Sequence, residues 1–293
     1  MAGIFTKFAG LTRKVPWLVS GVRAVLPRYL KRKIGAALLP SEKGGEVVAN
    51  DGRKFVMIPD RLFLQVVYDG IFEPSLTNFM TTVIKPEDTT VDVGSNFGWF
   101  ATLMAVKSSK NICYEPAKRI AGILKENIAL NAMDNITVRE VAIGSEPGEV
   151  TFVIEGDPER ESALGYVATE GDDVANNTTE TVKVVTLDED LAQHKGEISL
   201  MKVDCEGFEH EAFKGAKNLL TCDNPPVFIT EANREALGRS GTNREDMCAL
   251  LKQYGYTLYG MRSNGTLYAD DGKAPALVGA PPKGKFANRL TLP

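Results

Sequence analysis

The sequence predicts an α/β fold in which a mostly parallel central sheet carries helices on both faces and ends in an antiparallel hairpin. Strand-like and helix-like segments alternate from residue 89 to about residue 255, an order that is typical of parallel strands joined by helical crossovers. Two further strand-like runs, Tyr256–Met261 and Thr266–Ala269, are joined by Ser263-Asn264-Gly265. That tripeptide favours a hairpin turn, and it predicts one antiparallel strand at or near an edge of the sheet.

Short elements are expected before the alternating segment, in a lead-in that covers residues 46–88. The turn Asn50-Asp51-Gly52 joins two strand-like runs, which predicts a strand pair. The expected strands cover residues 46–49 and 54–58, and short helices are expected at 62–67 and 75–83.

The elements of the alternating segment follow from runs of buried-strand character and from apolar stripes at helical spacing. Strands are expected at 89–93, 111–114, 137–143, 150–154, 181–186, 198–203 and 227–230. Helices are expected at 98–107, from Pro116 to about Asn131, across 208–220, and from the capping box Thr242-x-x-Glu245 to about Gly255. Residues 273–293 are rich in proline and are expected to form a surface tail.

Charge separates a basic arm from an acidic body. The 293-residue chain has a net charge of −4. Residues 1–41 hold eight Lys or Arg and no acidic residue, which leaves −12 on the remainder. Apolar residues of the arm recur at spacings of four and three: Ile4, Phe8, Leu11, Val15, Leu18 and Val22. They predict an amphipathic helical arm, residues 1–45, with a kink or restart at Pro16. The arm either lies on an anionic membrane surface or packs on the acidic body, and the sequence leaves both open.

Composition and spacing argue against a membrane-spanning or secreted protein. The longest uncharged run, Val93–Val106, has fourteen residues, whereas a spanning helix needs about 20 apolar residues. No convincing secretory signal is present. The four cysteines are scattered without a CxxC pair, and the chain has only two histidines. We therefore expect free thiols, no metal site, and a reducing, cytoplasmic location with possible peripheral membrane contact through the arm.

The most informative motif is a glycine-containing loop directly after an expected strand and at the start of an expected helix. It reads Val91-Asp92-Val93-Gly94-Ser95-Asn96-Phe97-Gly98. Glycines here allow a tight turn and close approach of the backbone to a ligand. Asn96 stands where a dinucleotide fingerprint has its second glycine, and Asp92 would repel a pyrophosphate. The loop favours a ligand without phosphates, and the alternative is an ordinary strand–helix turn of an α/β protein.

Glu115 ends the second strand of the alternating segment, 21 residues after Gly94. In nucleoside-binding α/β folds, an acid at this place accepts hydrogen bonds from the ribose hydroxyls. Alone, Glu115 is equally well explained by the dipole of the helix that follows. Together with the glycine loop, it predicts an adenosine-type ligand.

A third motif, Lys202-Val203-Asp204-Cys205-Glu206-Gly207-Phe208-Glu209-His210-Glu211, follows the expected strand 198–203. Ligands of open α/β sheets bind at the carboxyl ends of the strands. Asp204 at the strand tip and Glu206 in the turn are therefore candidates for the site. The alternative is that the acids favour the helix dipole, which we accept for Glu211, and His210 is expected on the solvated helix surface.

These motifs together resemble the FkbM family of S-adenosylmethionine-dependent methyltransferases. The resemblance runs from about Tyr68 to Ala269. It includes Tyr68-Asp69-Gly70-Ile71-Phe72-Glu73-Pro74, the glycine loop, Tyr114-Glu115-Pro116 and the motif from Lys202 to Glu209. The family commonly has Ala in place of Ser95 and an aliphatic residue in place of Cys205. The resemblance implies a Rossmann-like class I methyltransferase fold, a methyltransferase domain over residues 89–272 and S-adenosyl-L-methionine as the cofactor.

The resemblance also implies roles for individual residues. The expected cofactor-binding residues are Asp92, Gly94, Ser95, Asn96, Gly98 and Glu115, with Asp92 beneath the loop and Glu115 on the ribose hydroxyls. The methyl group is expected to point toward Asp204 and Glu231. Asp204 or Glu206 is expected to receive the proton of a hydroxyl acceptor. The expected reaction is O-methylation of a hydroxyl on a sugar, glycoconjugate or secondary metabolite.

Other interpretations remain open at this point. They are an N-methyltransferase, a cation-dependent enzyme with oxygen ligands from Asp204, Glu206 and Glu231, and a non-catalytic adenosyl-ligand-binding or scaffold protein docked through the basic arm. The acidic run 155–180 is either a solvated loop or a lid over the acceptor. The acidic body disfavours nucleic acid, so the expected partner is a small-molecule or glycan acceptor.

Overall fold

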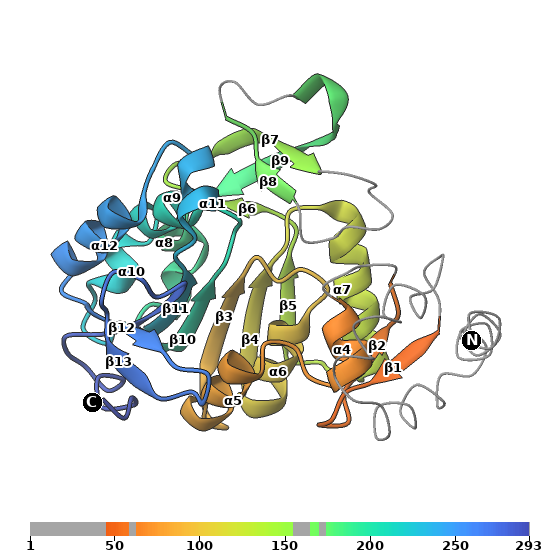
Figure 1. Ribbon diagram of the computed structural model, residues 1–293, viewed down its shortest axis with the longest axis horizontal. Helices are drawn as coiled ribbons and strands as arrows, with labels where there is room; N and C mark the ends of the chain where they lie inside the picture. The colour runs from red at the N-terminus through yellow and green to blue at the C-terminus, as the bar shows by residue number, and fades with distance from the viewer. Residues whose placement is uncertain (1–44, 59–62, 155–164, 170–173, 293) are drawn as a thin grey trace, which may run out of the picture.

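The computed structural model describes residues 45–58, 63–154, 165–169 and 174–292, and its centre is an eight-stranded sheet (Figure 1). The order of the strands is β13-β12-β14-β11-β10-β3-β4-β5. They are β3 (Thr89–Val93), β4 (Lys110–Tyr114), β5 (Ile136–Arg139), β10 (Ile198–Val203), β11 (Val227–Glu231), β12 (Thr257–Met261), β13 (Leu267–Ala269) and β14 (Ala276–Ala280). Neighbours from β11 to β5 run parallel, and β14, β12 and β13 pair antiparallel. The predicted fold class is confirmed.

Helices cover both faces of this sheet, and each face has its own apolar core. One core joins Leu200 and Ile229 to α4 (Phe63–Asp69), α5 (Pro74–Val83), α6 (Trp99–Lys107) and α7 (Lys118–Leu130). The other joins Met201 and Phe228 to α8 (Leu187–Asp190), α9 (Glu209–Lys214), α10 (Lys217–Leu220), α11 (Arg234–Arg239) and α12 (Arg244–Gln253). Successive residues of a strand point to opposite faces, and β10 is buried along its whole length.

A second, four-stranded sheet lies above the carboxyl ends of the central strands (Figure 1). It comprises β6 (Ala142–Ile143), β7 (Gly148–Ile154), β8 (Gly165–Val167) and β9 (Thr178–Val185) in the order β6-β9-β7-β8. The single strand expected at 137–143 is therefore two strands. β5 stays in the central sheet, whereas β6 pairs with β9. A continuous β-rich run carries no local signal for the sheet that each half will join.

The hairpin of β12 and β13 is present as predicted, but the tail contributes a strand that the sequence analysis missed. β14 lies between β11 and β12 and is antiparallel to both. Its five residues are flanked by Pro275 and Pro281, which made the segment look like irregular tail. Gly279 allows the fit, because a Cβ there would lie 2.1 Å from Cζ of Phe228 in the neighbouring strand.

The predicted helical segment at 208–220 and the predicted start of the helix near Thr242 both differ from the structure. The apolar face at 208–220 forms two short helices, α9 and α10, separated at Gly215, where a Cβ would lie 2.0 Å from the carbonyl oxygen of Gly144. The predicted capping box at Thr242 is wrong by one residue. Asn243 is the N-cap of α12, and its Oδ1 accepts a hydrogen bond of 2.8 Å from the amide of Asp246.

The lead-in strands β1 (Glu46–Val48) and β2 (Lys54–Val56) pair antiparallel as predicted. The predicted basic arm, residues 1–45, lies almost wholly outside the described residues, as does much of the acidic run 155–180. Among the described helices, none is long and apolar enough to cross a membrane.

Candidate active site

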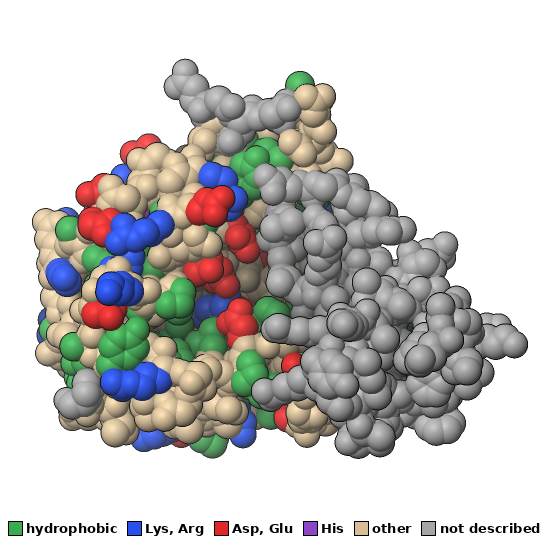
Figure 2. Space-filling view, viewed as in Figure 1, with side chains coloured by type: hydrophobic (Ala, Val, Ile, Leu, Met, Phe, Trp, Pro, Cys, Tyr) green, Lys and Arg blue, Asp and Glu red, His purple; other side chains and the backbone are tan. Residues whose placement is uncertain are grey.

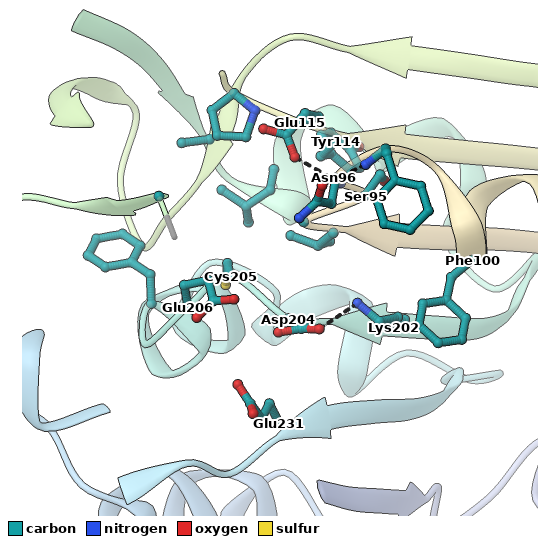
Figure 3. Close-up of a pocket in the computed structure, with 18 of the residues that line it drawn as sticks. Ser95, Asn96, Phe100, Tyr114, Glu115, Lys202, Asp204, Cys205, Glu206 and Glu231 are labelled. Atoms are coloured by element: carbon teal, nitrogen blue, oxygen red, sulfur yellow. Dashed lines mark hydrogen bonds and ion pairs between the residues drawn. The ribbon is translucent and has the colours of Figure 1, made fainter. Parts of the chain in front are cut away.

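A cavity of about 250 Å³ opens at the carboxyl ends of β3, β4, β10 and β11. Its walls come from the loop that follows each of these strands, from the start of α5 and from the second sheet. Figure 2 shows acidic side chains around a hollow on this face of the molecule, and Figure 3 shows the side chains that line the cavity. Parallel strands place their carboxyl ends at one edge of a sheet, so three motifs far apart in sequence meet here.

Gly94 and Asn96 shape the loop after β3, and both have left-handed backbone conformations. A Cβ on Gly94 would lie 1.7 Å from the carbonyl oxygen of Asp204, so only glycine lets the two loops touch. The amides of Gly94 and Ser95 both donate to the carbonyl of Tyr114 at 3.0 Å. Gly94, Ser95 and Asn96 line the cavity.

Asp92 and Gly98 belong to the same motif but do not line the cavity. Asp92 is fully buried beneath the loop, and burial raises its pKa to about 6, against the opposing effect of Lys202. A Cβ on Gly98 would lie 2.5 Å from Cδ1 of Leu124, so this glycine lets α6 pack against α7. Gly98 was expected next to the ligand; in the structure, the position that a side chain would occupy there is filled by Leu124.

Glu115 joins the loops after β3 and β4. Its Oε2 accepts a hydrogen bond of 2.9 Å from the amide of Asn96, and its Oε1 accepts one of 3.0 Å from the amide of Ala117. Burial raises the pKa of Glu115 to about 7, although these two amides favour its charged form. A carboxylate has about four lone-pair positions, so each oxygen of Glu115 keeps acceptor capacity at the cavity wall.

This part of the cavity fits an adenosyl cofactor. Glu115 supplies acceptors for a pair of vicinal hydroxyls, and the buried side chains of Ile143, Phe152 and Val167 supply apolar walls. Figure 3 shows the amide of Asn96 beside Glu115 at the same wall. Among the described residues that line this end, none has a basic side chain, so a ligand without phosphates is favoured.

Asp204, Glu206 and Glu231 come together at the other end of the cavity, as the sequence analysis expected (Figure 3). Burial, followed by the charges of Asp204, Glu231 and Glu209, raises the pKa of Glu206 to about 8. Burial and the charges of Asp204 and Glu209 raise the pKa of Glu231 to about 7. Glu206 also has a left-handed backbone, with φ of 54°.

Lys202 is the cation of this carboxyl group, and the sequence analysis did not single it out. Its Nζ lies 2.8 Å from Oδ2 of Asp204 and 3.8 Å from Oδ1 of Asp92, and 5.2 Å from the centre of the Phe100 ring. Burial disfavours its charge, but the carboxylates of Asp204, Asp92 and Glu73 outweigh this effect and raise its pKa. The signal available in the sequence was a charged residue, Lys202, near the end of a mostly apolar strand.

Glu73 is a second residue that the sequence analysis did not identify as part of the site. It is the N-cap of α5, has φ of 41° and lines the cavity. The preceding residue, Phe72, packs against Phe97 and Phe100, with ring centres 5.9 and 6.0 Å apart. Burial, and secondarily the charge of Asp204, raises the pKa of Glu73. Four described non-glycine residues have positive φ, and three of them line the cavity: Glu73, Asn96 and Glu206.

Asp204, Glu209 and Glu231 offer carboxylate oxygens within 4.8 Å of one another, a spacing that could hold a cation. Glu209, rather than the expected Glu206, is the third member. Oε1 of Glu209 already accepts hydrogen bonds from the amides of Cys205 and Gly207, at 2.9 and 3.1 Å. The ammonium of Lys202 already pairs with the carboxylate of Asp204. Through its two hydrogen bonds, Glu209 fixes the conformation of the loop after β10.

His210 and Glu211 do not line the cavity. Glu211 instead accepts hydrogen bonds from Ser145 and Lys214, at 2.6 and 2.8 Å. This agrees with the structural role that we accepted for Glu211.

The sequence matches the model of the Methyltransferase FkbM domain over residues 92–258, more than half of the chain. No protein with a curated description matches it significantly. Solved structures with a similar arrangement include the methyltransferase FkbM from Methylobacillus flagellatus (16% identity, 76% of this chain, 56% of that chain, TM-score 0.40). They also include a SAM-dependent O-methyltransferase from Thermotoga maritima (12% identity, 81% of this chain, 77% of that chain, TM-score 0.39). A third is an rRNA methylase from Streptococcus thermophilus (10% identity, 70% of this chain, 91% of that chain, TM-score 0.38).

The parallel sheet, the glycine loop after β3 and the acid after β4 define, with the family match, an S-adenosylmethionine-dependent methyltransferase of class I fold. The chain belongs to the FkbM methyltransferase family.

Proposed function

We propose that the protein methylates a hydroxyl group on a sugar, glycoconjugate or secondary metabolite. The observation that carries the proposal is the position of Asp204. Its carboxylate lies on the cavity wall, joined to the buried ammonium of Lys202 at 2.8 Å and close to Glu206 and Glu231. A carboxylate in a cavity of this kind can receive the proton that a hydroxyl loses as its oxygen is methylated.

The cofactor-binding half of the proposal rests on four residues. Gly94, Ser95 and Asn96 would hold the amino-acid end of S-adenosylmethionine, and Glu115 would accept hydrogen bonds from the ribose hydroxyls. Asp92 and Gly98 would act indirectly by shaping the loop. The bound cofactor would supply a sulfonium methyl group for in-line attack by the acceptor oxygen, with the thioether sulfur as the leaving group. The protein contributes mainly by aligning the reacting atoms and excluding water.

The acid–base half of the proposal assigns different roles to the three carboxyl groups. Asp204 receives the proton, because the adjacent ammonium of Lys202 compensates the charge of its carboxylate. Glu206, whose pKa is raised to about 8, holds its own proton at neutral pH and can donate a hydrogen bond. Glu231, with a pKa of about 7, can donate or accept one. Their environments thus separate a base from hydrogen-bond donors.

Transfer of labelled methyl from S-adenosylmethionine to fractionated cell extract tests the proposal. Asp204→Asn is expected to lower the rate by about 10²-fold or more, with cofactor affinity retained. Calorimetric titration with S-adenosylhomocysteine provides the affinity. Near-full turnover in both Asp204→Asn and Glu206→Gln would exclude the acid–base assignment. Binding without any transfer would favour the alternative of a non-catalytic adenosyl-ligand-binding or scaffold protein.

We further propose that the acceptor is a small molecule or glycan and not a nucleic acid, since the described cavity wall holds five acidic side chains against a single lysine. A reducing, cytoplasmic location is supported by Cys113, Cys205, Cys222 and Cys248, which are all free. The basic arm is our candidate for peripheral membrane contact. The full chain is expected to float with anionic liposomes, and a chain that begins at Ser41 is expected not to. Equal behaviour of the two chains would contradict this contact.

A further inference from the structure

A second cavity, of about 240 Å³, lies beside the first. The two cavities share Glu73, Lys202, Asp204 and Glu231, so they adjoin at the pair formed by Lys202 and Asp204. The glycine loop and Glu115 line only the first cavity. A molecule in the second cavity would therefore lie next to Asp204 and beside the proposed cofactor site.

The second cavity is lined by both charged and apolar residues. The charged residues are the four shared ones, and the apolar side chains on the same face of the sheet come from Leu76, Ile229, Pro275 and Ala276. Part of the apolar lining depends on β14, because Ala276 pairs with Glu231 in the sheet. A ligand that fills this cavity would meet both kinds of lining, so hydroxyl or similar groups together with C–H groups suit it.

The charges on the shared wall discriminate among ligand classes. An anionic group would lie against the carboxyls of Glu73 and Glu231, and a cationic group would lie against the ammonium of Lys202. Burial is the largest cause that raises the pKa values of Glu73 and Glu231, the latter to about 7. Glu231 is therefore partly protonated near pH 7, and a carboxyl group in that state both donates and accepts hydrogen bonds, as hydroxyl groups do. Neutral hydroxyl groups are therefore the best match.

The backbone of Glu73 is held at the start of α5, where Glu73 is the N-cap. Its left-handed backbone is unusual for a residue with a long side chain. Its amide donates to Oε1 of Gln65 at 3.1 Å, and its carbonyl accepts from the amide of Thr77 at 2.9 Å. Such conformations persist where the surrounding structure enforces them, and they cluster at functional sites.

We propose that this second cavity is the acceptor subsite, and that it takes an uncharged, hydroxyl-bearing group with one apolar face. Glu73 and Glu231 bind its hydroxyls, Leu76 and Ala276 contact its apolar face, and Asp204 receives the proton of the hydroxyl that is methylated. The inference rests on the proposed methyltransferase reaction. It extends that reaction by locating the acceptor and excluding phosphorylated and ammonium-bearing groups at the reacting end.

The class of acceptor is tested with small molecules extracted from the organism that encodes the chain. Ion exchange separates the extract into neutral, anionic and cationic pools, and each pool is incubated with the full chain and methyl-labelled S-adenosylmethionine. Label is expected in the neutral pool. Label in either charged pool instead would overturn the inference while leaving the methyltransferase proposal intact. Absence of label from all pools, with cofactor bound, would overturn both.

The place of the acceptor is tested with Leu76→Trp, which fills the second cavity only. Transfer to the neutral pool is expected to fall at least about tenfold, while affinity for S-adenosylhomocysteine stays at the wild-type value. Val106→Trp, at a residue that is 56% exposed on α6, is the matched control. Transfer by Leu76→Trp equal to that of the control would exclude the second cavity.

Glu73→Gln keeps the side-chain volume, and it tests the same acceptor subsite if Leu76→Trp does not fold. It is expected to raise the KM for the neutral acceptor several-fold, with unchanged affinity for S-adenosylhomocysteine. Glu87→Gln, at an exposed residue just after α5, is the control. An unchanged KM in Glu73→Gln would contradict the proposed subsite.

Discussion

Nζ of Lys202 lies 2.8 Å from Oδ2 of Asp204, and the lysine is almost fully buried at the end of β10. The two residues are separated by Val203 alone, whose side chain points to the opposite face of the sheet. A buried ammonium beside a carboxylate on the cavity wall links the stability of the central sheet to the chemistry of the site.

Lys202→Met is expected to leave the carboxylates of Asp92 and Asp204 without their counter-charge. Removal of one partner of a buried pair costs about 3–5 kcal/mol in unfolding free energy. The loss should be greater at pH 8 than at pH 5, where Asp92, whose pKa is about 6, is protonated. Urea denaturation of wild type and variant at both pH values measures this loss of unfolding free energy. Lys202→Arg should recover part of the stability, and equal stability of the Met variant and wild type at pH 8 would contradict the role of the pair.

Glu206→Gln is expected to stabilise the protein at high pH only. The pKa of Glu206 is raised to about 8, mainly by burial and then by Asp204, so the folded state binds its proton more tightly than the unfolded chain does. Its contribution to stability is complete below about pH 4.3 and is lost as the pH rises through about 8. The variant should match wild type at pH 5 and gain about 1–3 kcal/mol at pH 9 in urea denaturation.

The matched control for this prediction is Glu87→Gln, which replaces an exposed glutamate. It should leave the difference in stability between pH 5 and pH 9 unchanged. A gain in Glu206→Gln that is the same at both pH values would show that the raised pKa is not its cause.

Gly94→Ala is expected to abolish the contact between the β3 and β10 loops. Its Cβ would overlap the carbonyl oxygen of Asp204 at 1.7 Å, in addition to the strain of a φ of 75°. Gly52→Ala is the control, because φ is 88° there but no atom lies within 4 Å of the added Cβ. The control should lose about 1–2 kcal/mol. Gly94→Ala should lose more and should no longer bind S-adenosylhomocysteine, as measured by denaturation and calorimetry.

Glu115→Gln is expected to weaken binding of S-adenosylhomocysteine by about tenfold, or about 1.4 kcal/mol. An amide cannot accept hydrogen bonds at both terminal atoms, whereas Glu115 accepts from Asn96 and Ala117. Wild-type affinity should also fall as the pH drops below about 7, the pKa of Glu115, because protonation removes an acceptor. Glu146→Gln, at an exposed residue, is the control. Equal affinity in both variants would exclude Glu115 from the ribose site.

Much of the fold could be predicted from the sequence, because its signals are local. The run Thr89–Val93 is β3 with the predicted bounds, and the turn Ser263-Asn264-Gly265 joins β12 to β13. Gly94, Asn96 and Glu115 were predicted to lie together, since parallel strands bring their carboxyl ends to one edge. The closing strand was missed, because β14 is five residues between two prolines and acquires its place only from its neighbours.

The sequence by itself determined the fold class, the glycine loop and the acids at the strand tips, because each is encoded in contiguous residues and their periodicity. Only the tertiary structure decided which of those side chains face a cavity. It turned Gly98 toward Leu124, placed Glu73 beside a strand more than a hundred residues away, and set Lys202 where two cavities adjoin. These positions arise from packing between segments that are distant in the sequence. A local sequence pattern does not indicate which distant residue will compensate a buried charge.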